Sequence, residues 1–287
     1  MYKRQFPERD YTSAGATVTE ELGECRVILG VKEIPIDTIM PGKTYACFAH
    51  VIKGQPANMP ALRRFIELGC TLIDYEPIVD RRGRRLIFFG RHAGYAGMID
   101  TLWALGQRLE AEGIYTPLSD LRLAHQYASL DEATDHVSRI GARIRHEGLP
   151  ESLRPVAFAF TGSGNVSQGA QEVFDRLPFQ EVDPEELPGL AGDADRPRNV
   201  LFKTVFQRRH RAERTIGGGY DDDEFREHPD HYQTALTRHL PHLTVLVNGV
   251  YWEPSMPKLV TTAAIEALFR GCRDQLRHRR LPVDAVH

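Results

Sequence analysis

The chain has 287 residues, and at roughly 150 residues per domain this length predicts one large domain or two ordinary ones. The sequence holds 36 Lys and Arg against 39 Asp and Glu, and the resulting net charge of −3 gives no general electrostatic attraction for nucleic acid or anionic lipid. It contains no apolar run of about 18 residues, as a membrane span requires. We therefore expect neither nucleic acid nor a membrane as a partner.

The expected location is cytoplasmic, because the first residues lack the apolar run of a signal peptide. If the source is eukaryotic, the mitochondrial matrix is the alternative, although no transit peptide is seen. The four cysteines lack C-x-x-C spacing, and most have apolar neighbours, which predicts buried free thiols in a reducing compartment. These cysteines are Cys25, Cys47, Cys70 and Cys272.

Short apolar runs alternate with a helical segment in the first third of the chain. Residues 26–31 (RVILGV), 45–49 (YACFA) and 70–75 (CTLIDY) predict buried strands, because each run is apolar and bounded by turn residues. Pro60 predicts the start of a helix between the second and third runs. A further strand is predicted at residues 86–89 (LIFF). This alternation is typical of an α/β layer with a largely parallel sheet.

The middle of the chain holds two predicted helices and a strand. Residues 94–109 keep apolar side chains at helical spacing. Ser129 and Glu132 form an S-x-x-E capping box, which predicts the start of the next helix, and Gly148 predicts its end. Residues 156–161 (VAFAFT) then predict a continuous buried strand.

The loop after this strand carries a dinucleotide-binding pattern, G-x-G-x-x-S. It follows a buried strand and opens a segment with helical apolar spacing, which is the context that the motif requires. The first glycine permits a tight turn, the second lets the backbone approach a pyrophosphate, and the helix N-terminus supplies free N–H groups. A glycine-rich turn without a ligand is the alternative. The predicted cofactor contacts are Gly162, Ser163, Gly164, Asn165, Val166 and Ser167.

A carboxylate follows at the spacing expected for the adenosine ribose. The predicted strand 179–182 (FQEV) ends at Asp183, about 20 residues beyond the first glycine. Asp183 favours NAD, because the 2′-phosphate of NADP would meet a like charge. Arg196 and Arg198 lie close in sequence and could offset this charge, so the choice between NAD and NADP stays open.

Several long motifs carry a family resemblance. They are GVKEIP at residues 30–35, FAHVIKGQPANM at 48–59, IDYEPIVDRRGRR and FGRHAGYAGM within 73–98, TGSGNVSQGAQ at 161–171, and NGVYWEPSMPKLVT from Asn248. From about residue 6 to residue 262, the chain resembles the saccharopine-forming lysine–ketoglutarate reductases. These are relatives of lysine-forming saccharopine dehydrogenase in the alanine dehydrogenase and transhydrogenase superfamily. The resemblance favours NADP, whereas Asp183 favours NAD.

The resemblance implies an oxidoreductase of lysine metabolism that acts on CH–NH bonds. It would condense the ε-amine of L-lysine reductively with 2-oxoglutarate to give saccharopine, or catalyse the reverse. Lys32 and His50 would be its acid–base pair, as in the related enzymes. Histidine moves protons near neutrality, and a lysine does so when burial and a neighbouring cation lower its pKa. The ordinary alternatives are a solvated lysine and a structural histidine.

Other side chains are assigned from the same motifs. Lys53 and Gln55 would meet substrate carboxylates, Glu76 would hold an amino group, and Arg85 would bind a carboxylate or the cofactor. Surface ion pairs are the alternative for these four. The residues that would shape the nicotinamide pocket, with packing as the alternative, are Asn248, Tyr251 and Trp252. The histidines between residues 210 and 242 are irregularly spaced and predict no metal site.

The predicted fold is α/β, with two Rossmann-like lobes of mainly parallel sheets around a central cleft. Residues 1–92 would form a substrate domain, residues 93–262 a dinucleotide-binding domain, and residues 263–287 a tail. Family members carry an extra strand and helix at the start and a D-x-S strand and a helix after the PKLVT segment, and this sequence has neither. We therefore expect an incomplete first lobe, in a fragment or a member of a split system whose partner chain completes that lobe.

Two alternative functions stay open. One is an alanine-dehydrogenase-like reaction of ammonia with a simpler 2-oxo acid, against which the FAHVIK and DYE motifs argue. The other is a nicotinamide-binding, inactive module that serves a partner chain.

Overall fold

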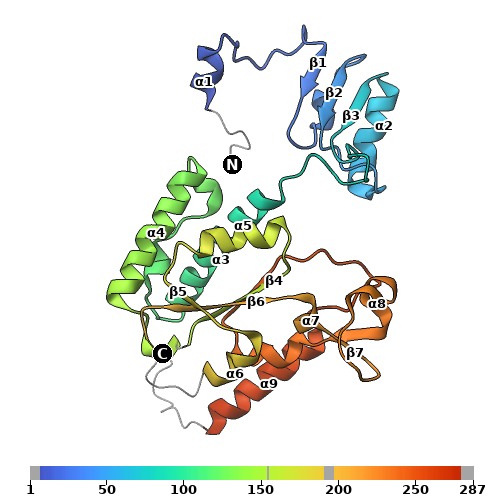
Figure 1. Ribbon diagram of the computed structural model, residues 1–287. Helices are drawn as coiled ribbons and strands as arrows, with labels where there is room; N and C mark the ends of the chain where they lie inside the picture. Colours follow the sequence, from blue (N-terminus) through green and yellow to red (C-terminus); the bar gives the residue numbers. More distant parts are fainter. Residues whose placement is uncertain (1–6, 154, 191–196, 279–287) are drawn as a thin grey trace. The chain divides into compact units, whose positions relative to one another are not determined.

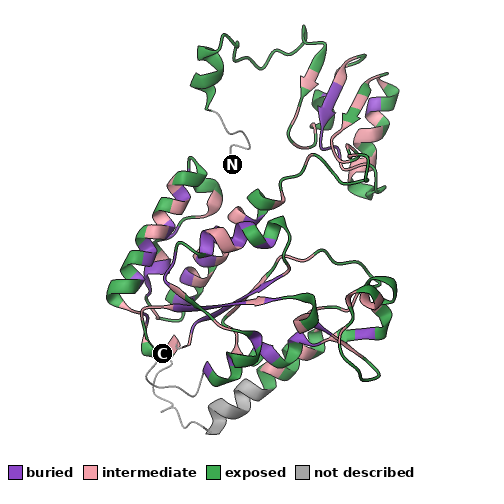
Figure 2. Cartoon of the chain, viewed as in Figure 1, coloured by how far each residue is buried: buried purple, intermediate pink, exposed green. Residues whose placement is uncertain are grey.

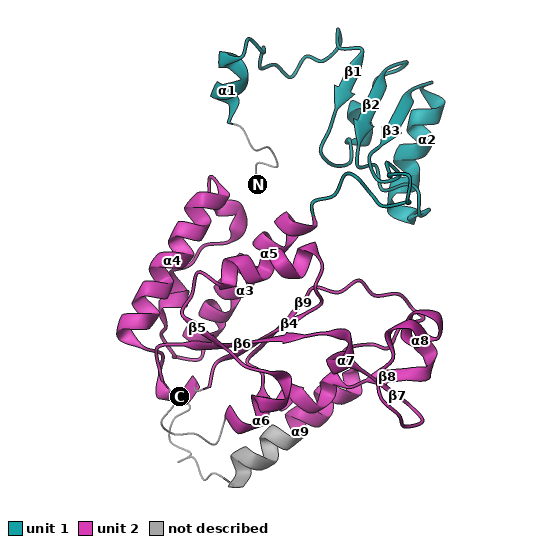
Figure 3. Ribbon diagram, viewed as in Figure 1, with its two compact units in different colours: residues 1–89 teal, residues 90–287 magenta. Residues whose placement is uncertain are grey.

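The computed structural model describes residues 7–153, 155–190 and 197–278 of the chain (Figure 1). The chain divides into two compact units, residues 1–89 and residues 90–287 (Figure 3). The sequence analysis places this boundary after residue 92, whereas the structure has it after residue 89. The helix and strand order is mixed, and the sheets are mainly parallel, so the predicted α/β class is confirmed. Each unit is described below by itself.

Unit 1 is built on a three-stranded parallel sheet in the order β1-β2-β3. Its strands are β1 (Val27–Leu29), β2 (Thr44–Cys47) and β3 (Thr71–Asp74), so the first three predicted strands are present, but the predicted burial holds only for β2. The predicted helix at Pro60 is α2 (Met59–Glu67), and Gly69 follows it with φ of 62°. The remaining elements of this unit are α1 (Glu8–Ser13), η1 (Ile36–Thr38) and η2 (Pro56–Asn58).

The two faces of this sheet differ in burial. Side chains alternate across a strand, so the paired residues Ile28, Tyr45 and Leu72 share one face. There they form a small core with Phe65 of α2 and Ile39. On the other face Val27, Leu29 and Ile73 are exposed by 56%, 73% and 45%, so this face is largely uncovered within the unit.

The strand predicted at residues 86–89 is wrong. The structure has only an isolated antiparallel bridge between Val79 and Arg85 there, and the segment then runs into the next helix. Leu86, Phe88 and Phe89 are 44–59% exposed. The run is apolar, but no strand of unit 1 lies beside it to supply a hydrogen-bonded ladder.

Unit 2 contains a four-stranded parallel sheet in the order β5-β6-β4-β9. The strands are β4 (Ala157–Thr161), β5 (Phe179–Glu181), β6 (Leu201–Phe206) and β9 (Val245–Asn248). The sequence predicts β4 and β5, but it does not predict β6. It lies between β4 and β5, so β5 is an edge strand and not a neighbour of β4.

Helices cover both faces of this sheet (Figure 1). On one face α3 (Gly90–Ala111), α4 (Leu130–Glu147) and α5 (Asn165–Phe174) enclose the larger core, in which Phe158 and Phe160 of β4 are fully buried. Half of the capping box predicted for α4 is present, because Ser129 Oγ accepts the Glu132 N–H at 3.1 Å, while Glu132 Oε2 accepts the N–H of Ala128 at 2.7 Å rather than that of Ser129. On the other face Ala157 and Ala159 of β4 meet α6 (Leu187–Leu190) and η8 (Leu236–His242). Figure 2 shows the buried residues gathered around these strands.

A small antiparallel hairpin extends unit 2. It pairs β7 (Ala212–Arg214) with β8 (Tyr232–Thr234), and α8 (Asp222–Glu227) lies between them in sequence. The remaining helices are α7 (Arg208–Arg211), α9 (Thr262–His278), η3 (Pro117–Asp120), η4 (Ala124–Gln126), η5 (Glu151–Leu153), η6 (Pro184–Glu186) and η7 (Pro229–His231). Among the helices described, none has the length and apolarity to cross a membrane.

The cysteines agree only partly with the predicted burial. Cys47 is buried, Cys70 is half-buried and Cys25 is exposed, and all three are free thiols. Cys25 lies in the irregular segment before β1 rather than in a core. The side chain of Cys272 lies outside the described residues.

Candidate active site

Three predicted site residues meet at one edge of the unit 1 sheet. Because β1, β2 and β3 are parallel, their carboxyl ends share this edge, which is where ligands bind in open α/β sheets. Lys32 follows β1, His50 follows β2 and Glu76 follows β3. Lys32 Nζ lies 3.4 Å from His50 Nε2, and His50 Nδ1 lies 3.3 Å from Glu76 Oε2. The fold thus forms a continuous series of amine, imidazole and carboxylate.

Two further predicted residues approach the other oxygen of the same carboxylate. Arg85 donates to Glu76 Oε1 at 3.4 Å, and Lys53 Nζ lies 3.8 Å from that oxygen. The Glu76 side chain is only 11% exposed, whereas those of Lys53 and Arg85 are 58% and 42% exposed. Gln55 is not brought to this cluster, because its exposed side chain makes no hydrogen bond with any described residue.

The sequence analysis missed a second carboxylate beside the imidazole. Glu33 Oε1 lies 3.7 Å from His50 Nε2, on the same side of the ring as Lys32. Glu33 directly follows Lys32 in the GVKEIP motif, and this position was the signal in the sequence that could have identified it. His50 therefore has an acidic partner at each ring nitrogen.

Backbone contacts hold His50 in an uncommon conformation. Its φ is 52°, and it is the one non-glycine residue in the described part of the chain with positive φ. Such a residue persists when its surroundings fix it. Asp74 Oδ1 accepts the N–H groups of Ala49 and Glu76 at 3.3 and 3.0 Å, and Asn58 Nδ2 donates to the His50 carbonyl at 3.1 Å. Asp74 thus ties together the two loops that carry the imidazole and its carboxylate, a role that the sequence analysis missed.

The Phe48 ring packs against the cluster, and the preceding residue, Cys47, carries a buried thiol. The Phe48 ring stacks on the His50 imidazole with a centroid distance of 5.8 Å and an interplanar angle of 18°. Lys32 Nζ and Arg85 Cζ lie 5.6 and 5.8 Å from the centroid of the Phe48 ring, within reach of a cation–π attraction. Burial, and then the charges of Asp74 and Glu33, raise the pKa of Cys47 to about 11. Cys47 is therefore a neutral packing group and not a nucleophile near neutral pH.

The glycine-rich loop of unit 2 joins β4 to α5, as predicted. Gly162 has φ of 85°, and a Cβ on it would lie 2.8 Å from Val250 Cγ1, so both conformation and space require glycine. Residues 163–166 are exposed, and their four N–H groups donate no hydrogen bond to any described residue. An exposed loop of free N–H groups at a helix N-terminus is suited to a phosphate.

The remaining residues of the motif divide between packing and exposure. Ser167 is buried, and a Cβ on Gly249 would lie 2.9 Å from Ser167 Cβ, so α5 lies close to the segment after β9. Asn248 Oδ1 accepts from Thr161 Oγ1 at 2.7 Å and joins the ends of β9 and β4. Beyond it the two predicted aromatic residues, Tyr251 and Trp252, are 70% and 43% exposed.

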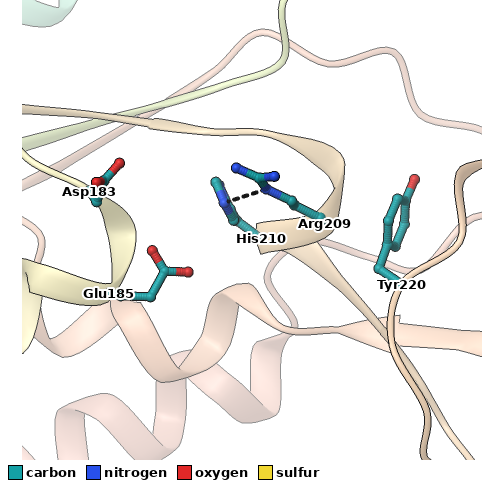
Figure 4. A pocket seen from close by; sticks show the side chains of 5 residues that line it. All are labelled: Asp183, Glu185, Arg209, His210 and Tyr220. Atoms are coloured by element: carbon teal, nitrogen blue, oxygen red, sulfur yellow. Dashed lines mark hydrogen bonds between the residues drawn. The ribbon is translucent and has the colours of Figure 1, made fainter.

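Asp183 lies beyond the end of edge strand β5 and lines a pocket of 510 Å³. The other residues lining the pocket are Glu185, Arg209, His210 and Tyr220 (Figure 4). Arg209 Nε lies 3.0 Å from His210 Nε2, and burial lowers the pKa of His210.

The arginines predicted to offset the charge of Asp183 do not lie there. Arg196 is outside the described residues. The suggestion for Arg198 is wrong, because it precedes β6 and lies at the amino end of the sheet, where its carbonyl accepts from the Leu149 N–H. Asp183 follows the carboxyl end of β5, and Arg209 follows that of β6, so the fold places a different arginine on the lining of the same pocket.

The structure thus has an amine–imidazole–carboxylate series at the strand ends of unit 1 and a glycine-rich strand-to-helix loop in unit 2. Residues 2–96 match the family "Alanine dehydrogenase/PNT, N-terminal domain". A solved structure titled "L-alanine dehydrogenase" matches with a TM-score of 0.47 and 15% identity over 91% of this chain and 59% of that one.

The curated relatives specify the comparison further. The chain is 40% identical over 267 residues to "Alpha-aminoadipic semialdehyde synthase, mitochondrial" of Mus musculus and 35% identical over 277 residues to the Arabidopsis thaliana protein "Alpha-aminoadipic semialdehyde synthase". Both matches cover 93% of this chain, but only 29% and 26% of the relatives. "Saccharopine dehydrogenase [NAD(+), L-lysine-forming]" of Yarrowia lipolytica is 37% identical over 57% of this chain and 45% of its own length. The chain is thus similar to these proteins over most of its own length, and the predicted resemblance is confirmed.

Proposed function

We propose that the protein is an oxidoreductase that condenses L-lysine reductively with 2-oxoglutarate to give saccharopine, or catalyses the reverse reaction. The observation that carries this proposal is the series Lys32, His50 and Glu76 at the carboxyl edge of the unit 1 sheet. The names of the relatives support the substrate class. The chain spans less than a third of the semialdehyde synthases, so the proposal concerns the chemistry to which these residues contribute.

Proton transfer is the work assigned to the series. The amine of lysine must be neutral before it attacks the carbonyl carbon of 2-oxoglutarate, and water must leave the resulting carbinolamine. Glu76 accepts a hydrogen bond from the Nδ1–H of His50. Nε2 is then the unprotonated, basic nitrogen of the ring, and it faces Lys32. His50 Nε2 then removes the proton of the attacking ammonium, and Lys32 donates a proton to the departing hydroxyl. Both groups are half-buried, so this region is partly shielded from water.

The cations around Glu76 define a binding subsite for the substrate's charged ends. Lys53 and Arg85 both approach Glu76 Oε1, so a substrate carboxylate that binds these cations frees the Glu76 oxygen. Glu76 is then available for the amino group of the same substrate. Gln55, on the exposed loop after His50, is proposed to reach a second carboxylate.

The loop of residues 162–167 is proposed to hold the pyrophosphate of a nicotinamide cofactor, which supplies hydride when bound. The free N–H groups of residues 163–166 and the glycine required at residue 162 support this assignment. Asn248 ends the strand next to β4, and we assign it, together with Tyr251 and Trp252, to the nicotinamide side. The pocket at Asp183 would take the adenosine ribose, and Arg209 beside it favours NADP over NAD.

One assay tests the reaction. Oxidation of NADPH and NADH is followed with lysine plus 2-oxoglutarate, and separately with pyruvate plus ammonia. We expect lysine-dependent turnover that falls at least 100-fold in Lys32→Met and His50→Gln, while the exposed control His146→Gln keeps it. Turnover with pyruvate and ammonia alone would instead favour the alanine-dehydrogenase-like reaction. Cofactor binding without turnover on either pair would favour the inactive module.

Cofactor choice is tested by fluorescence titration with NADH and NADPH. Arg209→Ala is expected to weaken NADPH binding about tenfold or more and to leave NADH binding nearly unchanged, because only NADPH carries the 2′-phosphate. Asp183→Asn is expected to improve the binding of NADPH relative to that of NADH. If neither variant changes the ratio of the two affinities, the pocket at Asp183 does not hold the ribose.

A further inference from the structure

Three side chains with metal-binding atoms lie together on the turn between α8 and β8, and none of them was assigned to the sites described above. His228, Asp230 and His231 each offer one ligand atom, and these atoms lie within 4.8 Å of one another. All three residues are exposed. The irregular spacing of the histidines over residues 210–242 predicts no metal site, but the fold brings two of them, His228 and His231, close together.

The turn explains why these two imidazoles meet. Pro229 begins the 3₁₀ helix η7, and in such a helix the side chains at positions i and i+3 eclipse one another. The rings of His228 and His231 accordingly stack with a centroid distance of 4.9 Å and an interplanar angle of 17°. The turn is fixed, because the His231 carbonyl accepts from both the N–H and the hydroxyl of Thr215 at 2.9 Å.

A carboxylate outside the cluster orients one of the rings. Glu224 Oε1 lies 3.3 Å from His231 Nδ1, while Tyr232 donates to Glu224 Oε2 at 2.7 Å and Arg214 Nε to the same oxygen at 2.6 Å. A metal-ligating histidine generally donates its second ring N–H to such a carboxylate, which fixes the tautomer and the ring orientation. Here the contact leaves His231 Nε2 for a ligand.

We propose that His228, Asp230 and His231 bind a divalent cation of the zinc class, with Glu224 as the positioning residue for His231. Two imidazoles and one carboxylate suit Zn²⁺ and its neighbours, and water would complete a tetrahedral shell. Ligand atoms of a tetrahedral zinc shell lie about 3.4 Å apart, so the exposed side chains rotate slightly to close on the ion. This proposal is independent of the proposed oxidoreductase function, because none of these residues belongs to that machinery.

The test is isothermal titration of the full chain with Zn²⁺ alone, followed by the visible absorption spectrum with Co²⁺. We expect one ion per chain and a Co²⁺ spectrum of low coordination number. His228→Asn and His231→Asn are expected to lower the affinity at least tenfold, and Glu224→Gln about tenfold. His146→Asn, at an exposed histidine of α4, is the matched control and is expected to bind as the wild type does.

Circular dichroism of each variant separates a lost ligand from a lost fold. His228 is exposed and its side chain makes no hydrogen bond with a described residue, so its variant provides the measurement least affected by folding. The absence of Zn²⁺ binding, or equal binding by the wild type and His228→Asn, overturns the proposal. An equal fall in Zn²⁺ affinity in the His146→Asn variant also overturns the proposal, because the ion would then bind adventitiously to surface histidines.

Discussion

The two units of the chain stabilise their sheets in different ways. In unit 2 helices cover both faces of the sheet, and the central strand β4 has five consecutive buried residues. In unit 1 α2 covers one face of a three-stranded sheet, and the fully buried part of that core is Ile39, Tyr45 and Phe65. The glycine-rich loop of residues 162–167 thus lies on a scaffold stabilised by apolar packing. The backbone that carries His50 is held by the polar contacts of the Asp74 and Asn58 side chains.

The largest effect is expected from the core of unit 2. Phe174 is fully buried, and its ring centroid lies 4.9 Å from that of Phe158 and 5.3 Å from that of Phe160. Phe174→Ala is expected to lower the free energy of unfolding of unit 2 by about 3–5 kcal/mol. Hydrogen exchange followed by mass spectrometry would show the loss in residues 90–278. Equal loss in residues 7–89 would show that the units do not unfold separately.

The next effect concerns the polar support of unit 1. Asp74→Ala removes the acceptor of the Ala49 and Glu76 N–H groups, so both site loops are expected to shift. The lysine-dependent rate is expected to fall about 100-fold, or about 2.7 kcal/mol in activation free energy. Asp37→Ala, at an exposed position of η1, is the control. A rate that stays within twofold of the wild type would show that packing alone positions His50.

A smaller effect is expected where α3 crosses α5. A Cβ on Gly94 would lie 2.1 Å from the Val166 carbonyl oxygen, whereas a Cβ on Gly97 of the same helix meets nothing within 4 Å. Gly94→Ala is expected to cost about 1–3 kcal/mol in stability and to weaken NADH binding, because it moves the N-terminus of α5. Gly97→Ala is expected to stabilise by up to about 1 kcal/mol. Urea denaturation of both variants measures the difference, and equal midpoints would contradict it.

The smallest effect is a pH dependence of unit 2. Burial lowers the pKa of His239, and also that of His136. Below the ordinary histidine value of about 6.5 the unfolded chain therefore binds more protons than the folded unit. The stability from these groups is complete above that value and falls as the pH drops toward the lowered pKa. His239→Leu is expected to flatten the thermal-melting profile between pH 7 and 5.5, and an unchanged slope would show that His239 contributes nothing to it.

Local patterns were sufficient to predict most of the elements. The capping box at Ser129, the apolar run of β4 and the glycine loop each depend on residues close in sequence, so their structures follow from short-range physics. The segment 86–89 shows the limit of this reasoning. A strand needs a neighbour for its hydrogen bonds, and an apolar run does not show whether one is present.

Contacts between distant segments could not be predicted. The position of β6 between β4 and β5 decides which arginine shares a pocket with Asp183, and nothing in the spacing of the first glycine and Asp183 indicates it. Within the site, Lys32, His50 and Glu76 were assigned from the family motifs, and they converge in the structure because each follows a strand of the same parallel sheet. The contacts of Asp74 depend on side-chain direction at the end of β3, which the sequence alone does not specify.

The buried Cys47 thiol provides a chemical probe for the opening of unit 1. Alkylating reagents attack thiolates, and Cys47 is both buried and held neutral by its pKa of about 11, whereas Cys25 is exposed. Cys25 should therefore be modified at once and Cys47 only when the sheet opens. The rate of alkylation of Cys47 would then measure how often the unit 1 sheet opens at β2, the strand that precedes His50.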